Sequence, residues 1–342
     1  MIPDLSLWGF EDGARAVAPS KTGLINQTFH VERDGHPLAI LQCLNTQIFD
    51  PVVHEDIDAV TKHLVSRGVP TTRLIPCRDG ALWHTDTHAG VWRCLTRVGE
   101  TTLDRFTHPS QVRSAGHIVG RWHAALGDLS WSFRSVRAGA HDTEAHLDRL
   151  AKAVEGNRTH RLYDPVAILA ESVARGWTSW DGPTELPQRV IHGDLKVSNL
   201  RFTSDEATAL IDLDTCGLGS LDVELGDALR SWCNPQGEDE EDPPFRLDWF
   251  EEALKGYAGG VGSSGIRDEE WEAIIPGVER IAWELAARFC RDALEESYFG
   301  WDARWGSSGE HNLHRAKGQA ALAARVRSVR VEAEGALRRA RA

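Results

Sequence analysis

The chain has 342 residues and a mass of 37.9 kDa, and its 38 Lys and Arg against 51 Asp and Glu give a formal charge of −13. This acidic balance argues against nucleic acid as the main partner, because duplex binding relies on a basic surface that neutralises phosphates. The hydrophobic content of 41% and the charged content of 26% are those of a folded globular protein, and the length allows two packed lobes. A small molecule is the expected partner.

The cysteines also exclude several classes of protein. All six lie far apart and form no CxxC pair, so neither a zinc cluster nor a small disulfide scaffold is predicted. The first ten residues lack the basic start and apolar run of a signal peptide, and no run of 18 apolar residues occurs. These features predict a cytoplasmic protein in a reducing compartment.

From Ala16 to about Arg97 the sequence consists mainly of short β-type runs. Two pairs of such runs flank Asp-Gly dipeptides, which are typical of hairpin turns and predict an antiparallel sheet. The predicted strands are residues 27–33, 37–43, 73–77 and 81–83. Between the two hairpins, apolar side chains from Val53 to Leu64 recur at spacings of four, three and four, which predicts one helix packed on the sheet.

From about residue 99 the pattern changes to long amphipathic helices with a few short strands. The first helix begins at Pro109 and carries an apolar stripe as far as Leu126. The other predicted elements are strands near 190–191, 200–202 and 209–213 and helices near 223–232, 247–257, 269–296 and 312–337. The acidic run at 238–242 is expected to be a solvated loop.

The stretch from His192 to Asn199 carries the clearest chemical signal. It reads HGDLKVSN, and an apolar run over 209–211 follows it and leads into Asp212. Phosphoryl transfer from ATP needs a carboxylate that orients the attacking hydroxyl and oxygen ligands that hold Mg²⁺ on the phosphates. Protein kinases space their catalytic Asp and metal-binding Asn in this way and add a second Asp after the next hairpin. The pattern predicts Asp194 as the base and Asn199 and Asp212 as metal ligands.

These motifs resemble the signature HGDxxxxN…IDxD of the aminoglycoside phosphotransferase and choline kinase superfamily. The resemblance implies an α+β, bilobal protein-kinase-like fold, with a small antiparallel-sheet lobe carrying one helix and a larger, mainly helical lobe. Residues 1–98 would form the nucleotide-binding lobe and residues 99–342 the catalytic and substrate-binding lobe. It also implies ATP and Mg²⁺ as cofactors, with no membrane or nucleic-acid partner. His192 would brace the catalytic loop, and Asp227 would accept hydrogen bonds from the backbone of that loop.

Within this superfamily the chain is most similar to the N-acetylhexosamine 1-kinase branch. The matching segments are GLINQTFHV at 23–31, ILQ at 40–42, LDT at 213–215, GDALR at 226–230, RF at 288–289, YF at 298–299 and HNL at 311–313. The likeness implies transfer of the γ-phosphate to the anomeric hydroxyl of a hexose or N-acetylhexosamine. It assigns Asn26 and Gln42 to the nucleotide and His30, Arg288 and Tyr298 to the sugar.

Other readings stay open. Gln42 stands where most kinases carry the ATP-binding lysine, and Glu55 stands where they carry the acidic partner of that lysine. The missing charge leaves room for an inactive pseudokinase that serves as a binding module. Among enzymes, the alternative is an aminoglycoside or other amino-alcohol phosphotransferase, because a charge of −13 would attract a cationic substrate. The sugar kinase is the leading prediction.

Overall fold

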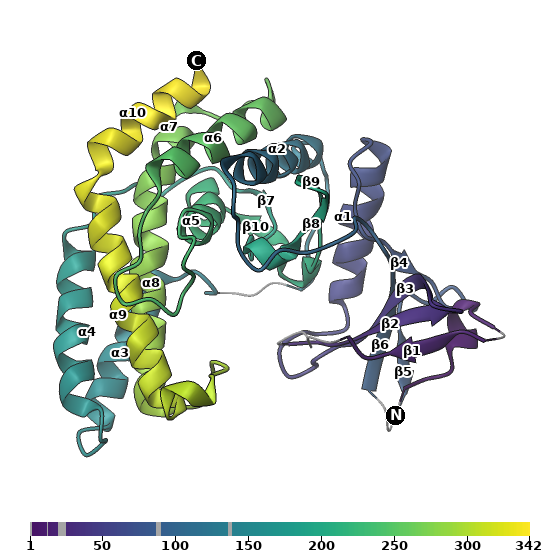
Figure 1. Cartoon of the computed structure of the whole chain (residues 1–342), viewed down its shortest axis with the longest axis horizontal. Coiled ribbons are helices and arrows are strands. Elements are labelled where there is room, and N and C mark those ends of the chain that lie inside the picture. Colours follow the sequence, from purple (N-terminus) through teal and green to yellow (C-terminus); the bar gives the residue numbers. More distant parts are fainter. Residues whose placement is uncertain (1, 12, 20–24, 87–89, 136–138) are drawn as a thin grey trace.

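The structure is a computed structural model, and it describes residues 2–11, 13–19, 25–86, 90–135 and 139–342. It has two parts, a sheet with one helix and a larger helical part, which lie side by side in Figure 1. We call them the N-terminal and C-terminal lobes. This arrangement confirms the predicted α+β, kinase-like fold class.

The N-terminal lobe is built on a six-stranded antiparallel sheet of order β1-β2-β3-β6-β4, in which β5 also pairs with β6. Its strands are β1 (Arg15–Val17), β2 (Gln27–Arg33), β3 (His36–Cys43), β4 (Leu74–Ile75), β5 (His84–Asp86) and β6 (Gly90–Thr96). The first predicted hairpin is confirmed, with Asp34 and Gly35 at positive φ in the turn between β2 and β3. The second is wrong, because β4 and β5 each pair with β6 and residues 81–83 form no strand.

The two faces of this sheet have different surroundings. On one face Val31, Leu41 and Cys94 are buried against the short 3-10 helix η1 (Leu5–Trp8). Side chains alternate along a strand, so Gln42 and Arg93, which are opposite each other in the β3–β6 register, lie on the other face. The predicted helix forms as α1 (Val53–Ser66) and buries Ile57, Val60 and Leu64.

The C-terminal lobe contains nine α-helices among the described residues. They are α2 (Pro109–Leu126), α3 (Thr143–Gly156), α4 (Tyr163–Thr178), α5 (Leu221–Trp232), α6 (Leu247–Val261), α7 (Asp268–Glu272), α8 (Ile274–Glu295), α9 (Ser308–Ser328) and α10 (Arg330–Arg341). The sequence did not predict α3 and α4, and two predicted long helices are each divided, at Ala273 and at Val329. The lobe also contains two antiparallel pairs, β7 (Arg189–Ile191) with β10 (Gly217–Gly219) and β8 (Leu200–Thr203) with β9 (Glu206–Leu210).

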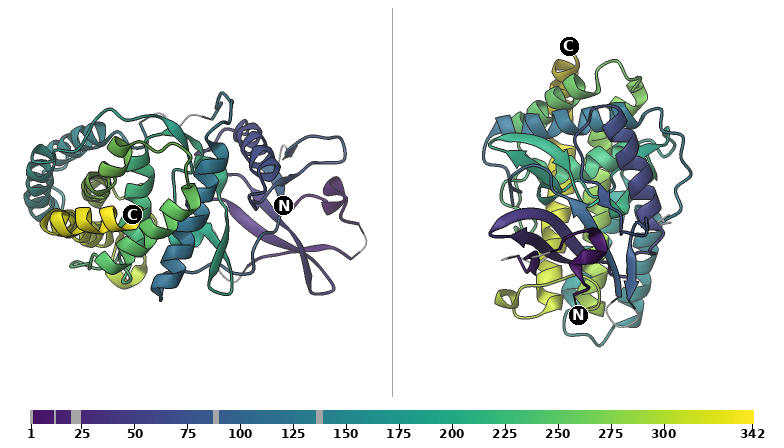
Figure 2. Two further views of the ribbon diagram at one scale, coloured as in Figure 1. Left: turned by 90° about the horizontal axis from the view of Figure 1, so that it is seen from above. Right: turned by 90° about the vertical axis from the view of Figure 1, so that its right-hand side faces the viewer.

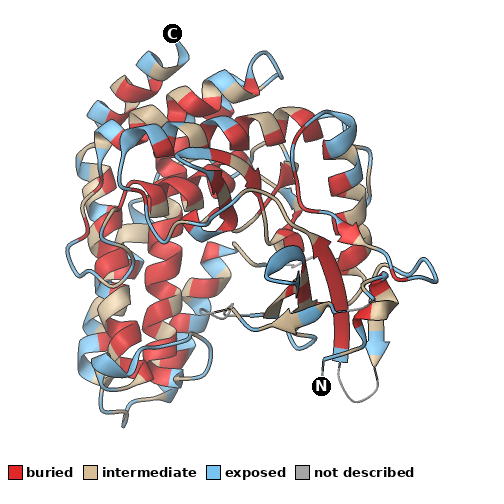
Figure 3. Ribbon diagram, turned by 45° about the vertical axis from the view of Figure 1, so that its right-hand side comes forward, coloured by how far each residue is buried: buried red, intermediate tan, exposed pale blue. Residues whose placement is uncertain are grey.

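Helices α2 and α8 organise the core of this lobe. Seen from above, α2 lies between α1 and the other C-terminal helices (Figure 2). It crosses α6 closely, because a Cβ atom on Gly256 would stand 1.9 Å from the carbonyl oxygen of Arg113. Burial is concentrated in the central helices and the sheet (Figure 3), and α8 is buried along most of its length. None of the described helices combines the length and the apolar run that a membrane span needs.

Candidate active site

The HGDLKVSN segment forms a loop between β7 and β8 and is held by a buried carboxylate. The backbone N–H groups of His192 and Gly193 donate to the two oxygens of Glu224, at 2.8 and 2.9 Å. Gly193 has a φ of 77°, and a Cβ atom there would stand 2.8 Å from the carbonyl oxygen of Thr215, so this position requires glycine. The indole of Trp232 donates to the carbonyl of Leu195 at 2.7 Å, which fixes the middle of the loop.

Glu224 is itself part of a buried chain of polar groups. It is 2% exposed, and Nε2 of His123 lies 3.2 Å from its carboxylate while Nδ1 of the same ring lies 3.0 Å from the Tyr257 hydroxyl. Burial alone would raise the pKa of Glu224, but its hydrogen bonds with His123 and with the loop hold that pKa below the usual value. The loop is therefore held by an ionised carboxylate.

His192 lies as predicted and Asp227 does not. Nε2 of His192 is 2.9 Å from the carbonyl oxygen of Ile211, so this imidazole joins the catalytic loop to the segment that carries Asp212. The backbone hydrogen bonds that the resemblance assigned to Asp227 belong to Glu224, three residues earlier on α5. Asp227 instead accepts from the guanidinium of Arg230 at 3.1 Å.

Asp194 lies at the centre of a charged group. Its Oδ2 accepts from Lys196 Nζ at 2.6 Å and from Asn199 Nδ2 at 2.9 Å, and the same amide donates to its backbone oxygen at 2.8 Å. No donor among the described residues contacts its Oδ1, and the side chain is 29% exposed. The structure therefore brings Asp194 and Asn199 together and leaves one Asp194 oxygen open to a substrate hydroxyl.

Asp212 follows β9 in a backbone conformation that is unfavourable for most residues, with φ 65° and ψ 56°. Its carboxylate has no hydrogen-bond or ion-pair partner in the described part of the chain. Burial and then the neighbouring charge of Asp214 raise its pKa to about 6. A half-buried carboxylate without a partner and with a strained backbone is typical of a functional site and suits a cation.

Asn26 and Gln42 belong to one buried network with Arg93 and Asp214. Arg93 binds both carboxylate oxygens of Asp214, with Nη2 to Oδ2 at 2.7 Å, and its Nε donates to Oε1 of Gln42 at 2.9 Å. Asn26 Nδ2 donates to Asp214 Oδ2 at 2.8 Å, and the Gln42 amide donates to Thr28 Oγ1 at 3.1 Å. The two residues that the resemblance assigned to the nucleotide thus belong to one buried network.

The three amino acids predicted to bind the sugar lie on two different lobes. Arg288 on α8 lies 5.9 and 5.5 Å from the ring centroids of Tyr298 and Phe299, and 3.7 Å from Glu284. Tyr298 is 60% exposed. His30 is half-buried on β2, and its alternation with Thr28 puts it on the same sheet face as Gln42. Arg288 and Tyr298 are therefore brought together, whereas His30 belongs to the other lobe.

A polar cluster lies beside Arg288. Nδ1 of His141 and the hydroxyl of Thr143 contact the buried carboxylate of Glu284 at 3.1 and 2.9 Å. Burial opposes the charged form of His141, but its hydrogen bond to Glu284 and the charge of Asp227 raise its pKa. His141 and Arg288 thus share the buried carboxylate of Glu284.

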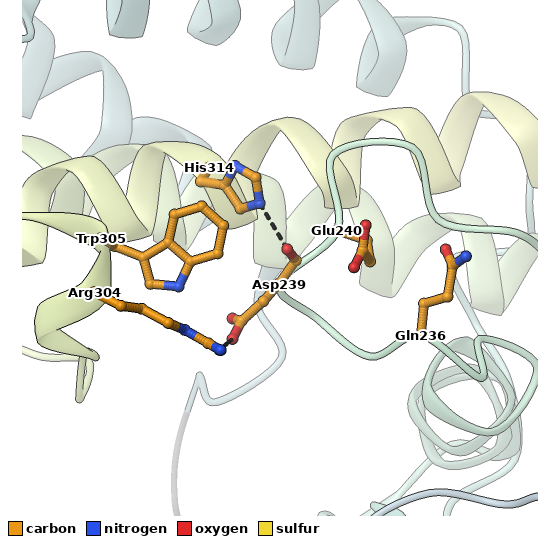
Figure 4. A pocket seen from close by; sticks show the side chains of 6 residues that line it. All are labelled: Gln236, Asp239, Glu240, Arg304, Trp305 and His314. Atoms are coloured by element: carbon orange, nitrogen blue, oxygen red, sulfur yellow. Dashed lines mark hydrogen bonds and ion pairs between the residues drawn. The ribbon is translucent and has the colours of Figure 1, made fainter.

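The acidic run at 238–242 is an exposed loop, as its composition predicted, and it is also held by ion pairs. Basic side chains of α5 and α9 bind four of its five acidic residues: Arg230 binds Glu238, His311 and Arg315 bind Asp239, Lys317 binds Glu241, and Arg325 binds Asp242. Figure 4 shows the cavity of about 470 Å³ between this loop and Trp305, with Asp239 bound to Arg304 and His314. None of the predicted catalytic or sugar residues lines that cavity.

Comparison with known proteins agrees with this geometry. The model of the phosphotransferase enzyme family matches residues 17–260, which include the catalytic loop and Asp212. The chain belongs to the phosphotransferase enzyme family. The chain is similar to proteins named homoserine kinase. The one from Bradyrhizobium sp. is 28% identical over 173 residues, which cover 50% of each chain. The one from Zymomonas mobilis is 25% identical over 231 residues, which cover 64% of this chain and 63% of the other. The matches thus span about half to two thirds of these relatives.

Solved structures of the phosphotransferase family show the same fold. A microcompartment-associated aminopropanol kinase has a TM-score of 0.64 at 18% identity, covering 95% of both chains. An amicoumacin kinase in complex with AMP-PNP, Ca²⁺ and Ami has a TM-score of 0.60 at 15% identity and covers 95% of this chain and 90% of its own. The predicted superfamily and fold class are thereby confirmed.

Three site residues were missed by the sequence reasoning. Lys196 stands two positions after Asp194, and its charge inside the motif was the available signal. Glu224 lies three residues before Asp227 on α5 and was not considered, because the resemblance assigned this role to Asp227. Arg93 had no sequence signal, because only the pairing of β3 with β6 places it beside Gln42.

Proposed function

We propose that this kinase transfers the γ-phosphate of ATP to a hydroxyl of an uncharged sugar, most simply the anomeric hydroxyl of a hexose or N-acetylhexosamine. In this proposal residues 1–98 bind the nucleotide and residues 99–342 supply the catalytic groups and the acceptor site. The observation that carries it is the pairing of charges around Asp194. A site whose ionised groups already balance one another recognises its ligand by hydrogen bonds rather than by net charge.

The charges on the acceptor side form short chains of opposite sign. Lys196 neutralises Asp194, and Arg230 lies between Asp227 and Glu238 at 3.1 and 2.9 Å. Glu284 is shared by His141 and Arg288. A polycationic aminoglycoside needs several acids without partners, and the acidic run is bound to the chain's own basic residues. The arrangement therefore supports a neutral, polyhydroxylated acceptor.

In the proposed reaction Asp194 orients the acceptor hydroxyl and takes its proton while the oxygen attacks the γ-phosphorus. The bond from the γ-phosphorus to the β,γ-bridging oxygen breaks, and ADP leaves with the electron pair. Lys196 is placed to leave Asp194 for the γ-phosphate, which frees the carboxylate and adds positive charge where negative charge develops. This exchange would supply the charge that Gln42 lacks.

The residues present fit Mg²⁺. Asp212 offers a carboxylate without a partner, and Asn199 keeps its Oδ1 for a cation because its Nδ2 is used by Asp194. No group of three or more His, Cys, Asp or Glu that could hold a metal occurs in the described ranges, and Mg²⁺ needs none, since it commonly uses one or two protein carboxylates with phosphate oxygens and water. When bound, the ion would neutralise charge on the β- and γ-phosphates. Asp212 and Asn199 would hold it, and Lys196 would act from the other side.

A second acceptor class is favoured by the relatives. The relatives compared above are named homoserine kinase, and one structural neighbour is an aminopropanol kinase. Homoserine is a zwitterion, and an Arg such as Arg288 could bind its carboxylate as a fork. We rank this class second, because its ammonium group would need an acid without a partner and Asp227 is bound to Arg230.

The acceptor class can be tested directly. ADP release should be measured with purified enzyme, MgATP and separate panels of hexoses, N-acetylhexosamines, homoserine, amino alcohols and aminoglycosides. The proposal expects turnover with a sugar and an acid-labile, non-reducing product, because the anomeric centre is consumed. Turnover only with homoserine or an amino alcohol would replace the sugar by the second class. A sugar product that still reduces copper would contradict the anomeric assignment alone.

A further inference from the structure

The ion pair between Arg93 and Asp214 joins the two lobes. Arg93 is on β6 of the N-terminal sheet and Asp214 is in the short 3-10 helix η3 (Leu213–Thr215) that follows Asp212 in the C-terminal lobe. Their side chains are only 2% and 1% exposed, and both oxygens of Asp214 are bound by the guanidinium. A fully buried bidentate ion pair therefore crosses from the sheet to the turn that carries the proposed metal ligand.

The surrounding side chains complement this pair. Arg93 Nε donates to the side-chain oxygen of Gln42, and Asn26 Nδ2 is a third donor to the Asp214 carboxylate. Asn26 in turn accepts from the backbone N–H of Asn45 at 3.0 Å, which connects the end of β3 to the same carboxylate. A lysine in place of Gln42 would bring a second cation against Arg93 and remove the acceptor of Arg93 Nε. The glutamine is thus the residue that Arg93 requires at this position.

Among the described residues, no charged side chain of α1 forms an ion pair with the sheet. In protein kinases a β3 lysine pairs with a glutamate on the corresponding helix when the site is assembled. Here Glu55 forms an ion pair of 2.5 Å with Arg134, which lies outside the sheet, and the Glu55 side chain is 33% exposed. The residue of α1 near Arg93 is His54, whose ring stacks on Trp83. Burial and the charge of Arg93 lower the pKa of His54 to about 4. The helix therefore presents a neutral ring to the ion pair.

We propose that Arg93–Asp214 is the interlobe lock of this kinase and that Arg93 is a positioning residue for Asp212. The lock takes the place of the lysine–glutamate pair and ties the N-terminal sheet to the metal-binding turn instead of to α1. Because Asp214 uses both oxygens on Arg93, it is withdrawn from metal binding, and Asp212 alone faces the nucleotide. The lock therefore sets the position of the turn whose Asp212 has a left-handed backbone.

A buried ion pair such as Arg93–Asp214 is not readily explained by its contribution to folding stability. Taking two charges out of water costs several kcal/mol, so replacing a buried pair by apolar residues is often neutral for folding, whereas removing one partner is costly. This asymmetry separates a structural role from a positioning role. A variant without both charges can keep its fold and still lose the connection between the sheet and the turn.

The test compares Arg93→Met, Asp214→Leu and the double variant with a matched pair inside one lobe. Arg189 and Glu270 form that control, since they make a bidentate ion pair with one fully buried partner at 2.5 and 2.7 Å. For each protein, the melting temperature, the radius of gyration by X-ray scattering, and the Kd of ADP with and without Mg²⁺ are measured. None of these readouts depends on the acceptor, so a wrong sugar assignment would leave them unchanged.

The lock predicts that each single variant melts roughly 5–15 °C below wild type and that the double variant recovers part of this loss. It also predicts that the double variant has a larger radius of gyration and loses about tenfold or more of the tightening that Mg²⁺ gives to ADP. The control double variant, Arg189→Met with Glu270→Leu, should keep that tightening. A folded Arg93→Met/Asp214→Leu protein with wild-type Mg²⁺ tightening would overturn the proposal.

A conservative variant keeps the test decisive if the double variant does not fold. Arg93→Lys retains the charge but loses the fork and the bond to Gln42. For Arg93→Lys the proposal predicts a radius of gyration near wild type. It also predicts that the tightening of ADP binding by Mg²⁺ is reduced by about three- to tenfold. Mg²⁺ tightening within about twofold of wild type in folded Arg93→Lys would equally overturn it.

Discussion

The buried carboxylate of Glu224 accepts a hydrogen bond of 2.8 Å from the backbone N–H of His192, and its other oxygen binds the next residue, Gly193. This contact ties the start of the catalytic loop to α5. The position of Asp194, one residue further, therefore depends on a carboxylate that is only 2% exposed.

Glu224→Gln should lower both stability and turnover. The amide NH₂ of glutamine would face a backbone N–H, which leaves a buried donor without an acceptor and costs about 2–4 kcal/mol. A displaced loop should reduce kcat by about 10- to 100-fold while the KM for ATP stays near wild type. Glu279→Gln is the control, since Glu279 is also buried on a helix but binds Trp283 and Arg327 away from the loop. Equal kcat losses in the two variants would contradict the positioning role.

Lys196→Met should reduce kcat strongly and leave the fold intact, because this side chain is 39% exposed and its charge is proposed to act on the γ-phosphate. Loss of one preorganised charge at such a position commonly costs about 10²–10³-fold in kcat. Lys62→Met removes another lysine from an ion pair with an aspartate, at 2.7 Å on α1, and should leave kcat unchanged. A Lys196→Met enzyme within about threefold of wild type would assign this lysine to neutralising Asp194 in the resting protein only.

Asp212 should make nucleotide binding depend on pH. Its pKa is raised to about 6, so the carboxyl is protonated below that pH and cannot hold a cation. The Mg²⁺-dependent part of ADP affinity should fall by about tenfold per pH unit below pH 6 and level off above it. Asp212→Asn should abolish this dependence together with the Mg²⁺ effect.

The same raised pKa makes a separate prediction for stability without metal. Between pH 4 and 6 the unfolded chain has released the Asp212 proton while the folded chain retains it, so this group lowers the free energy of unfolding as pH rises. Urea denaturation of wild type and Asp212→Asn isolates this contribution. A wild-type protein that gains stability relative to Asp212→Asn over this interval would contradict the raised pKa.

Arg288→Ala should weaken acceptor binding. The guanidinium stands against Tyr298 and Phe299, and loss of a charged hydrogen bond to substrate costs about 1.5–3 kcal/mol, which would appear as a higher KM for the acceptor and an unchanged KM for ATP. Arg291→Ala on the same helix, which breaks the exposed pair with Glu295, should change neither constant. An unchanged acceptor KM in Arg288→Ala would leave this arginine a purely structural role.

The sequence predicted those elements and site residues that depend on contacts between residues close together in the chain. The β2–β3 hairpin, α1 and α2 follow from turn dipeptides and apolar spacing, and the loop with Asp194 and Asn199 follows from chemistry encoded within eight residues. Helices α3 and α4 were not predicted, although both are as amphipathic as α1 and α2. The acidic run was correctly predicted as an exposed loop, but its ion pairs were not, because most of its partners lie on α9, about 75 residues later, where no local pattern reports them.

The role of Asp194 is the central claim, and turnover of Asp194→Asn tests it most directly. The asparagine keeps the shape of the side chain and one acceptor oxygen but has no charge and no basic site. With saturating MgATP and the acceptor identified by ADP release, kcat should fall by about 10²–10⁴-fold, while ADP affinity and melting temperature stay near wild type. An Asp194→Asn enzyme that retains more than about a tenth of wild-type kcat, with chemistry rate-limiting, would show that Asp194 is not the catalytic base.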